Sequence, residues 1–408
     1  MSKKEQINSC SACDDSDSCL KKRRGAVGGQ AIIEGVMMKS KLHTAIAVRR
    51  LDNKKIVVTR KGNSSISDKI KLFKLPLLRG VVNFIESMML SFSTITEGTD
   101  MLGLDVAEEE QSKLDKWLEK HCGKWLMGVI SAISVILGVA IALGLFIYLP
   151  TLIGGFAMNI FFDQFENVHG DTIYVFKDWI ESLLPWFVEL CGSLAEGETF
   201  QGFVAHEAVP GAIRSVIEGV LKVVIFIAYI WLTALIPDMK RVYKYHGAEH
   251  KSIFCYEAGL ELNVENVKKQ SRFHPRCGTS FMFAMMFLSI FIGFFLWWVD
   301  VTWLRSLIKL ALLPLTVGIG YEFIRYAGRH DNWLIRFLAT PGLWMQKLTT
   351  KEPEDDIIEV AITSLKCALP DDFPGFYEEC LARQEEENNE NDENAEEAPS
   401  ASEEEIEA

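Results

Sequence analysis

The sequence predicts a mainly α-helical polytopic membrane protein. We expect about four transmembrane helices, a small N-terminal β-containing cytoplasmic unit and amphipathic C-terminal helices. Two observations support this fold class. The chain is 49% apolar and its mean hydropathy is +0.13, although its last 26 residues are strongly acidic. Four apolar stretches also reach the length of about 20 residues that a helix needs to cross a bilayer.

Acidity is concentrated in one segment. The formal net charge is −13, and residues 383–408 hold twelve acidic residues against the single Arg383. This tail therefore carries −11, and the rest of the chain is close to neutral. A chain with this balance does not bind nucleic acid through overall basicity. We expect the polar residues 1–25 and the tail 383–408 to be disordered.

Residues 26–100 predict a cytoplasmic β-rich unit followed by an amphipathic helix. Two short apolar runs, Thr44 to Arg49 and Ile56 to Thr59, flank the turn-prone pair Asp52 and Asn53, which indicates a β-hairpin. Apolar residues within 76–97 recur at helical spacing. The helix is expected on the membrane surface or in a core.

The four predicted transmembrane helices cover residues 125–149, 215–236, 279–299 and 305–327. The first and third contain no Asp, Glu, Lys or Arg. The second contains Glu218 and Lys222, four residues apart, which we interpret as an ion pair that makes insertion tolerable. The fourth contains Lys309, Glu322 and Arg325, with a kink expected at Pro314.

Charges in the loops predict the orientation. Residues 150–214 hold nine acidic residues and two cations, whereas residues 237–278 hold eight cations. The positive-inside rule places 237–278 in the cytoplasm and 150–214 outside. Both termini, and the amphipathic helices expected within 328–382, then lie in the cytoplasm. The N-terminus has no apolar run typical of a cleavable signal peptide, and a bacterial plasma membrane is the expected location.

The motif with the clearest chemistry is His246-Gly247-Ala248-Glu249-His250 in the predicted cytoplasmic loop. Residues four apart share one face of a helix, so both imidazoles reach one ion. Glu249 is placed to act as a general base. This is the H-x-x-E-H arrangement of inverted zincins, in which zinc lowers the pKa of its bound water to about 7.

A catalytic metal site needs a further protein ligand. Glu322, His274 and Cys277 all fall at the predicted cytoplasmic boundary, and Glu34 and His43 are additional candidates. We expect a divalent metal, with zinc as the first choice. The alternative is a polar network without metal, in which the two histidines pair with Glu249, Glu257 or Glu322.

Five segments resemble one protein family: GGQAIIEGVMM (28–38), AVRR (47–50), LLRGVVNFIES (77–87), HGAEHKSIFCYEAGLELNVENVKKQSRFHPRCGTSF (246–281) and PGLWMQKLTTKEPEDDIIEVAI (341–362). The chain resembles the YqhQ-like family of bacterial membrane proteins over roughly residues 26–370. That family has no known function and is commonly labelled a metal-dependent enzyme. The resemblance implies membrane topology and a metal, and His246, Glu249, His250, His274 and Cys277 match the family motif.

Three functions remain open at this point. The first is a metal-dependent hydrolase that acts at the cytoplasmic leaflet on a peptide or lipid-linked substrate. The second is a non-catalytic accessory protein of a translocation, insertion or other membrane assembly. The third is a transporter or channel, although four spans with few buried charges offer little to line a path. Membrane lipids, a membrane-protein partner or a second copy of the chain are the expected partners.

Overall fold

The computed structural model describes residues 23, 25–63, 75, 77–103, 124–165, 209–296, 302–327 and 333–396. These residues form a mainly helical protein with a small N-terminal antiparallel sheet, as the sequence predicts. In chain order, the elements are β1 (Gly28–Ile32), β2 (Gly35–Lys39), β3 (His43–Arg49), β4 (Ile56–Gly62), α3 (Leu78–Asp100), α5 (Lys124–Leu143), the π-helix η3 (Gly144–Tyr148), α6 (Leu149–Phe165), α10 (Val209–Thr233), α11 (Pro237–Glu257), α12 (Val264–Lys268), α13 (Gly278–Phe294), α14 (Thr302–Ala311), α15 (Leu313–Ala327), α16 (Trp333–Thr349), α17 (Asp355–Ala368) and α18 (Phe376–Glu396).

The sheet is an antiparallel meander with strand order β1-β2-β3-β4. Strands β3 and β4 pair from His43 opposite Gly62 to Arg49 opposite Ile56, which confirms the predicted hairpin. Side chains alternate between the two faces of a strand. Val36 and Met38 therefore join one buried cluster, whereas Met37 between them joins another.

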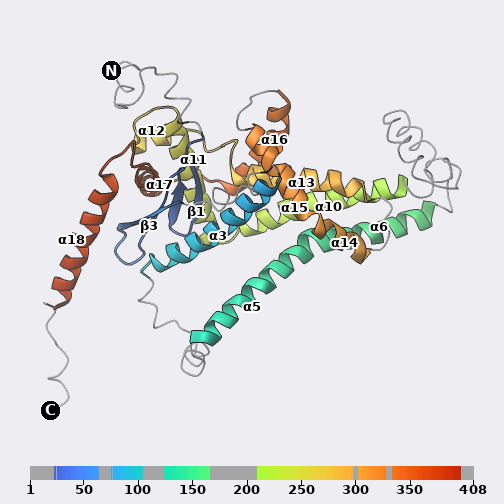
Figure 1. Ribbon diagram of the computed structural model, residues 1–408, viewed down its shortest axis with the longest axis horizontal. Helices are drawn as coiled ribbons and strands as arrows, with labels where there is room; N and C mark the ends of the chain where they lie inside the picture. The colour runs from blue at the N-terminus through green and yellow to red at the C-terminus, as the bar shows by residue number, and fades with distance from the viewer. Residues whose placement is uncertain are drawn as a thin grey trace, which may run out of the picture.

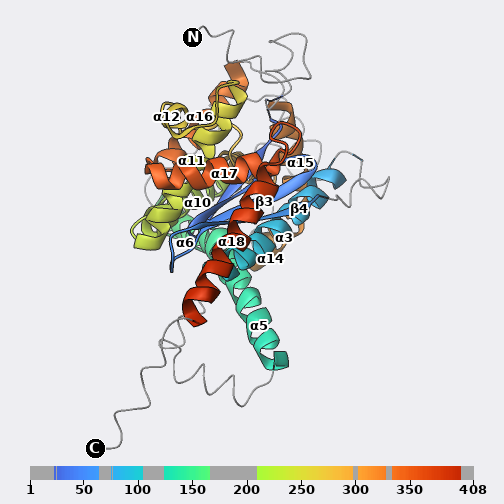
Figure 2. The same ribbon diagram turned by 90° about the vertical axis from the view of Figure 1, so that its left-hand side faces the viewer.

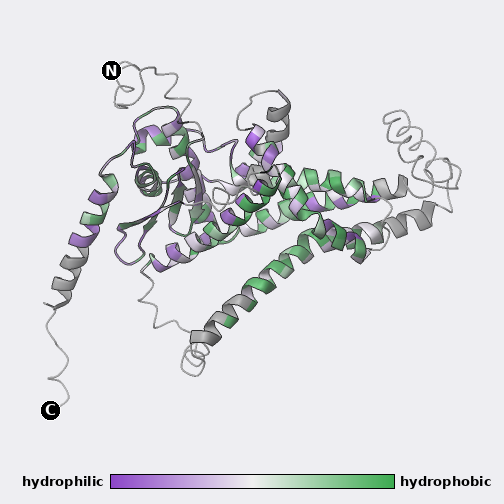
Figure 3. Cartoon of the chain, in the orientation of Figure 1, coloured by the Kyte–Doolittle hydropathy of each residue, from purple (hydrophilic) through white to green (hydrophobic). Residues whose placement is uncertain are grey.

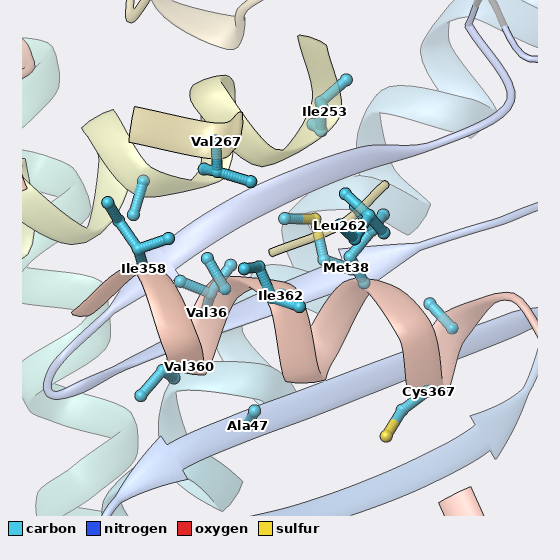
Figure 4. Close-up of a cluster of buried hydrophobic side chains, with 14 of the residues drawn as sticks. Val36, Met38, Ala47, Ile253, Leu262, Val267, Ile358, Val360, Ile362 and Cys367 are labelled. Carbon is cyan, nitrogen blue, oxygen red and sulfur yellow. The ribbon is translucent and has the colours of Figure 1, made fainter. Parts of the chain in front are cut away.

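One face of the sheet is covered by α17 and α11. Figure 4 shows α17 lying across the strands, with Val36 and Ile358 beside one another. Ile357, Ile358 and Leu365 are fully buried. The C-terminal part of the chain thus supplies the core helix of the N-terminal sheet, whereas the sequence predicts only cytoplasmic amphipathic helices within 328–382. Distant apolar faces bury each other because this removes apolar area from water.

In Figures 1 and 3, the apolar helices α10, α13, α14 and α15 lie to the right of the sheet, and α5 runs below them. Within the described residues, Ile133–Ala157 and Ile213–Thr233 are long and apolar enough to cross a membrane. A third crossing results if Thr302–Ala311 and Leu313–Phe323, which meet at a 46° bend, form one broken span. Met282–Phe294 is apolar but shorter. The structure therefore supports two or three of the four expected spans by length.

Two boundaries differ from the sequence prediction. The first apolar helix does not end at residue 149: α5, η3 and α6 follow without interruption to Phe165. Pro150 is tolerated because it lies at the beginning of α6, where the wider π-helical turn precedes it. The connection that the sequence predicts as 150–214 is thus shorter, because α10 also begins at Val209; residues 166–208 lie outside the described part.

The structure describes only part of the two ends that the sequence predicts to be disordered. Residues 1–22 and 24 lie outside the described residues, so the expectation for the N-terminus stays a prediction. Helix α18 continues into the acidic tail as far as Glu396, and residues 397–408 lie outside the described part. In Figure 2, α18 extends downward across the sheet end of the molecule. The structure thus has helix between residues 383 and 396, where the sequence leads us to expect disorder.

Glu218 is the centre of a buried ionic cluster between α10 and α14. Its carboxylate, 3% exposed, lies 3.0 Å from Arg214 Nε and 3.3 Å from Arg305 Nε, and it also pairs with Lys309. Lys222 instead donates to the Ser289 hydroxyl, 2.8 Å away. The interpretation of Glu218 and Lys222 as an ion pair is thus wrong, because Arg214 of α10 and two cations of the second helix, α14, pair with the carboxylate instead.

Replacing Glu218 with Gln should strongly destabilise the protein. The variant leaves Arg305 and Lys309 buried without the carboxylate that they share, and losing one partner of a buried ion pair costs about 3–5 kcal/mol of unfolding free energy. Thermal unfolding in detergent measures the effect. Glu265→Gln is the matched control, because Glu265 and Lys269 form an exposed i,i+4 pair. Equal melting temperatures for the two variants would contradict the structural role of the cluster.

Candidate metal centre

His246 and His250 project from α11, which follows α10 in the chain and packs against strands β1 and β2. The helix begins with Pro237 after the extended residue Ile236, and Asp238 lies in its first turn. Proline fits the first helical position because no intrahelical acceptor awaits its nitrogen, and an acidic first turn complements the helix dipole. The four-residue spacing then brings the two imidazole centroids within 4.4 Å.

Backbone carbonyls orient both imidazole rings. His246 Nδ1 lies 2.8 Å from the Thr349 carbonyl oxygen, and His250 Nδ1 lies 2.5 Å from that of Arg272. A carbonyl only accepts, so both Nδ1 atoms carry the proton and both Nε2 atoms present a lone pair. His250 is 1% exposed, and its Nε2 has no hydrogen-bond partner among the described residues. A ring whose second nitrogen donates to a backbone carbonyl is typical of metal-binding histidines.

Cys277 completes a set of three donors. Its Sγ lies 3.2 Å from His246 Nε2, and one donor atom each from His246, His250 and Cys277 lie within 4.8 Å of one another. Zinc–nitrogen and zinc–sulfur bonds of about 2.0–2.3 Å in a tetrahedral site require donor separations of about 3.3–3.8 Å. The nitrogen and sulfur donors therefore fit zinc with small side-chain adjustments, and a three-residue set leaves a fourth position for water or substrate.

The donors are assembled by close contact between segments that are far apart in the chain. Gly247 packs against the backbone of Lys351, and a Cβ built on this glycine would lie 2.1 Å from the Lys351 oxygen. That approach places the Thr349 carbonyl next to His246. Buried Gln346 of α16 accepts from the His274 N–H and donates to the His274 carbonyl, both at 2.7 Å. Gln346 thereby holds the loop that leads to Cys277.

Glu249 is buried beside this donor set. Its side chain packs on Gly29 of β1, where a built Cβ would lie 2.7 Å from Glu249 Cγ, and the Gly29 N–H donates to the carboxylate. Burial raises the pKa of Glu249 to about 7, while the hydrogen bond from the Gly29 N–H acts in the opposite direction. Strand β1 thus positions a carboxyl group that exchanges a proton near neutral pH.

The other predicted ligands lie elsewhere. Glu322 pairs with Arg79 of α3, whose Nε lies 2.6 Å from Glu322 Oε1. Glu34 accepts from Arg241, 2.7 Å from its Nη2, and from the Tyr245 hydroxyl. Both carboxylates are therefore engaged by guanidinium groups and are separate from the donor set. His43 begins strand β3 and is likewise not among the three donors.

His274 lies next to the donor set without joining it. Its ring centroid is 5.6 Å from that of His250, and its Nδ1 accepts from the Arg276 N–H at 3.3 Å. Its Nε2 lies 3.9 Å from a Glu257 oxygen, which is beyond hydrogen-bond distance. Burial lowers the pKa of His274, which favours its neutral form. The structure therefore places it as a neighbour that packs against His250.

Sequence reasoning did not find several residues that build the site. Thr349 and Arg272 act through backbone carbonyls, which any residue possesses, so no sequence signal identifies them. Gln346 is a single amide within an amphipathic helix. Gly29 belongs to a glycine-rich segment that is usual before a hairpin. Only Gly247 gave a signal, since glycine within a predicted helix indicates either a weak helix or a close approach.

Fold and donor set together define a mainly helical protein that has apolar helices long enough to cross a membrane and a candidate metal centre at one end of them. A family model described as "Protein of unknown function (DUF1385)" matches residues 75–371. The chain is also 32% identical over 343 residues to "Uncharacterized protein YqhQ" of Bacillus subtilis (strain 168), a match that covers 83% of this chain and 91% of that protein. The chain therefore belongs to the YqhQ-like family. No solved structure matches it.

Proposed function

We propose that this protein is a zinc-dependent hydrolase of the membrane, acting at the cytoplasmic leaflet. One observation carries the proposal: two imidazoles, each with its Nδ1 on a backbone carbonyl, lie so close to one cysteine that a donor atom from each of the three residues falls within 4.8 Å of the other two. A buried polar atom without a partner is costly, and His250 Nε2 is such an atom. A bound cation removes that cost.

Each residue of the site has a distinct role in this proposal. His246, His250 and Cys277 would hold the metal, and zinc would supply Lewis-acid polarisation of a substrate carbonyl or phosphoryl group. Glu249 accepts a proton, helped by the N–H of Gly29 that stabilises its charged form. Strand β1 packs on Glu249 and excludes bulk water from its carboxyl group, which strengthens charge interactions within the site.

The proposed setting has four spans in a bacterial plasma membrane: α5 with α6, α10, α13, and the bent pair α14 and α15. Their order then returns the sheet unit, α11 and α16–α18 to the same side, as the grouping in Figure 1 suggests. The cation-rich segment 237–278 supports a cytoplasmic position for that side and for both termini. The metal centre would then face substrates at the inner leaflet, either peptides or lipid-linked molecules.

Glu249→Gln tests catalysis. The amide keeps the shape of the carboxyl group but accepts no proton, so the variant should retain zinc and its melting temperature while losing at least about 100-fold in activity. A chromosomal Glu249→Gln replacement should reproduce the growth phenotype of a gene deletion, because catalysis is lost in both. This readout does not require the substrate to be known. Zinc content, measured on the purified variant, separates loss of chemistry from loss of metal.

An alternative is an accessory protein in which zinc is structural. The donor set favours this reading in one respect, because it connects α11, the loop before α13 and, through Thr349, the end of α16. Zinc in such a position stabilises a fold. If Glu249→Gln supports normal growth while His246→Ala does not, the structural role is correct and the hydrolase proposal fails.

A further inference from the structure

The distribution of side chains on α3 is the reverse of that on a surface helix of a soluble protein, whose large apolar residues face the core. Its buried positions are small residues, Gly80, Thr94 and Gly98. Large apolar side chains form one exposed stripe instead: Leu78, Ile85, Met88, Met89, Phe92 and Ile95, each 42–64% exposed. These positions recur at three- and four-residue spacing and so lie on one face. We call them the α3 stripe.

The two halves of α3 contact different parts of the protein. The N-terminal half crosses α15, where Gly80 packs on Gly318 and Tyr321, and Asn83 donates to the Tyr321 hydroxyl at 2.7 Å. The C-terminal half packs on the sheet, with Gly98 against Ile32 of β1. Figure 1 shows α3 between the sheet and α15. Neither contact covers the α3 stripe, which faces away from both.

We propose that α3 enters the inner leaflet and that the α3 stripe contacts lipid. The proposal rests on the membrane topology proposed above. Helices in lipid turn small residues toward neighbouring helices and large apolar residues toward the lipid, because lipid imposes no penalty on exposed apolar area. Contiguous apolar surface of this kind is uncommon where water is the solvent.

Lipid is the favoured occupant because the stripe begins beside a membrane helix. Exposed apolar side chains of α15, Leu315 and Ile319, lie on the same helix that α3 crosses at Gly318. Glu322 on α15 pairs with Arg79 at the beginning of α3, which places polar groups where the helices leave the apolar region. On α16, Trp344 is 68% exposed and Lys347 lies over its ring, a combination typical of the membrane interface.

This contact would fix the metal centre relative to the bilayer. Helix α3 packs on β1 through Ile32, and β1 also holds Glu249 through Gly29. Strand β1 therefore contacts both α3, which the proposal places in lipid, and Glu249, the proposed base. A substrate anchored in the inner leaflet would meet the site at a constant depth.

A fluorescent amino acid introduced at single positions tests the inference in the full-length protein. The protein is reconstituted in phosphatidylethanolamine and phosphatidylglycerol nanodiscs, with or without lipids that carry a quenching spin label on the acyl chain. Probes replace Met88 and Phe92 of the stripe. Ser87 is the matched control, because it is exposed and adjacent to Met88 but lies on another face of α3. A probe at Ile136 of α5 reports on the topology itself.

We expect spin-labelled lipid to quench the probes at Met88 and Phe92 at least about twofold more than the probe at Ser87. Equal, weak quenching at all three α3 positions, with strong quenching at Ile136, would overturn the α3 proposal and leave the topology intact. Weak quenching at Ile136 would overturn the topology as well. A blue-shifted but unquenched stripe would identify a protein partner, such as a second copy, in place of lipid.

Discussion

Protein purified with Cys277→Ser should bind zinc at least about 100-fold more weakly than the unaltered protein, because loss of a direct ligand exceeds the 10- to 100-fold effect of losing an outer-shell partner. The hydroxyl of serine is a poor zinc ligand, yet it preserves the size of the thiol. His250→Ala should have the same effect on zinc. Metal content after dialysis against a weak chelator, measured by mass spectrometry, gives the result.

Two controls make the metal experiment decisive. His43→Ala removes a histidine outside the donor set and should retain full zinc. Glu322→Gln disrupts the pair with Arg79 and should also retain it, because Glu322 is not a donor in this structure. Loss of zinc in the Glu322 variant with retention in the Cys277 variant would replace the proposed ligand set. Absence of zinc from the unaltered protein, expressed with zinc present, would refute the metal centre.

Gly247→Ala should destabilise the protein by about 3 kcal/mol or more, although alanine is the better helix former. Helix propensity alone predicts a gain of about 1 kcal/mol for this change in α11. The added methyl group would lie 2.1 Å from the backbone oxygen of Lys351, and backbone cannot rotate away as a flexible side chain can. The sign of the change in melting temperature therefore separates the two explanations.

The same substitution should weaken zinc binding by about 10- to 100-fold, since displacing residues 349–351 removes the Thr349 carbonyl from His246 Nδ1. Gly28→Ala is the matched control, because no atom lies within 4 Å of a Cβ built there. It should leave both stability and zinc binding nearly unchanged. A Gly247→Ala protein that melts higher and binds zinc normally would show that α11 and residues 349–351 are not in close contact.

Local patterns were enough to predict much of the architecture. Alternating apolar residues and the turn at Asp52 and Asn53 predicted the β3–β4 hairpin, because a strand repeats every two residues. The length of the apolar runs predicted helices able to cross a bilayer. These features depend on neighbours in the chain, so the sequence contains them directly. The burial of α17 does not depend on neighbours in the chain, since the strands that it packs against lie about 300 residues earlier.

For the site, the sequence by itself determined that His246 and His250 share one face, because helical periodicity requires it. Only the tertiary structure decided which third donor joins them. Glu322 and Cys277 were equally plausible from topology. Arg79, 243 residues before Glu322, forms an ion pair with that carboxylate. Gln346 instead holds the loop that brings Cys277 to the imidazoles. Contacts between distant segments follow from the packing of whole elements, and no local pattern encodes them.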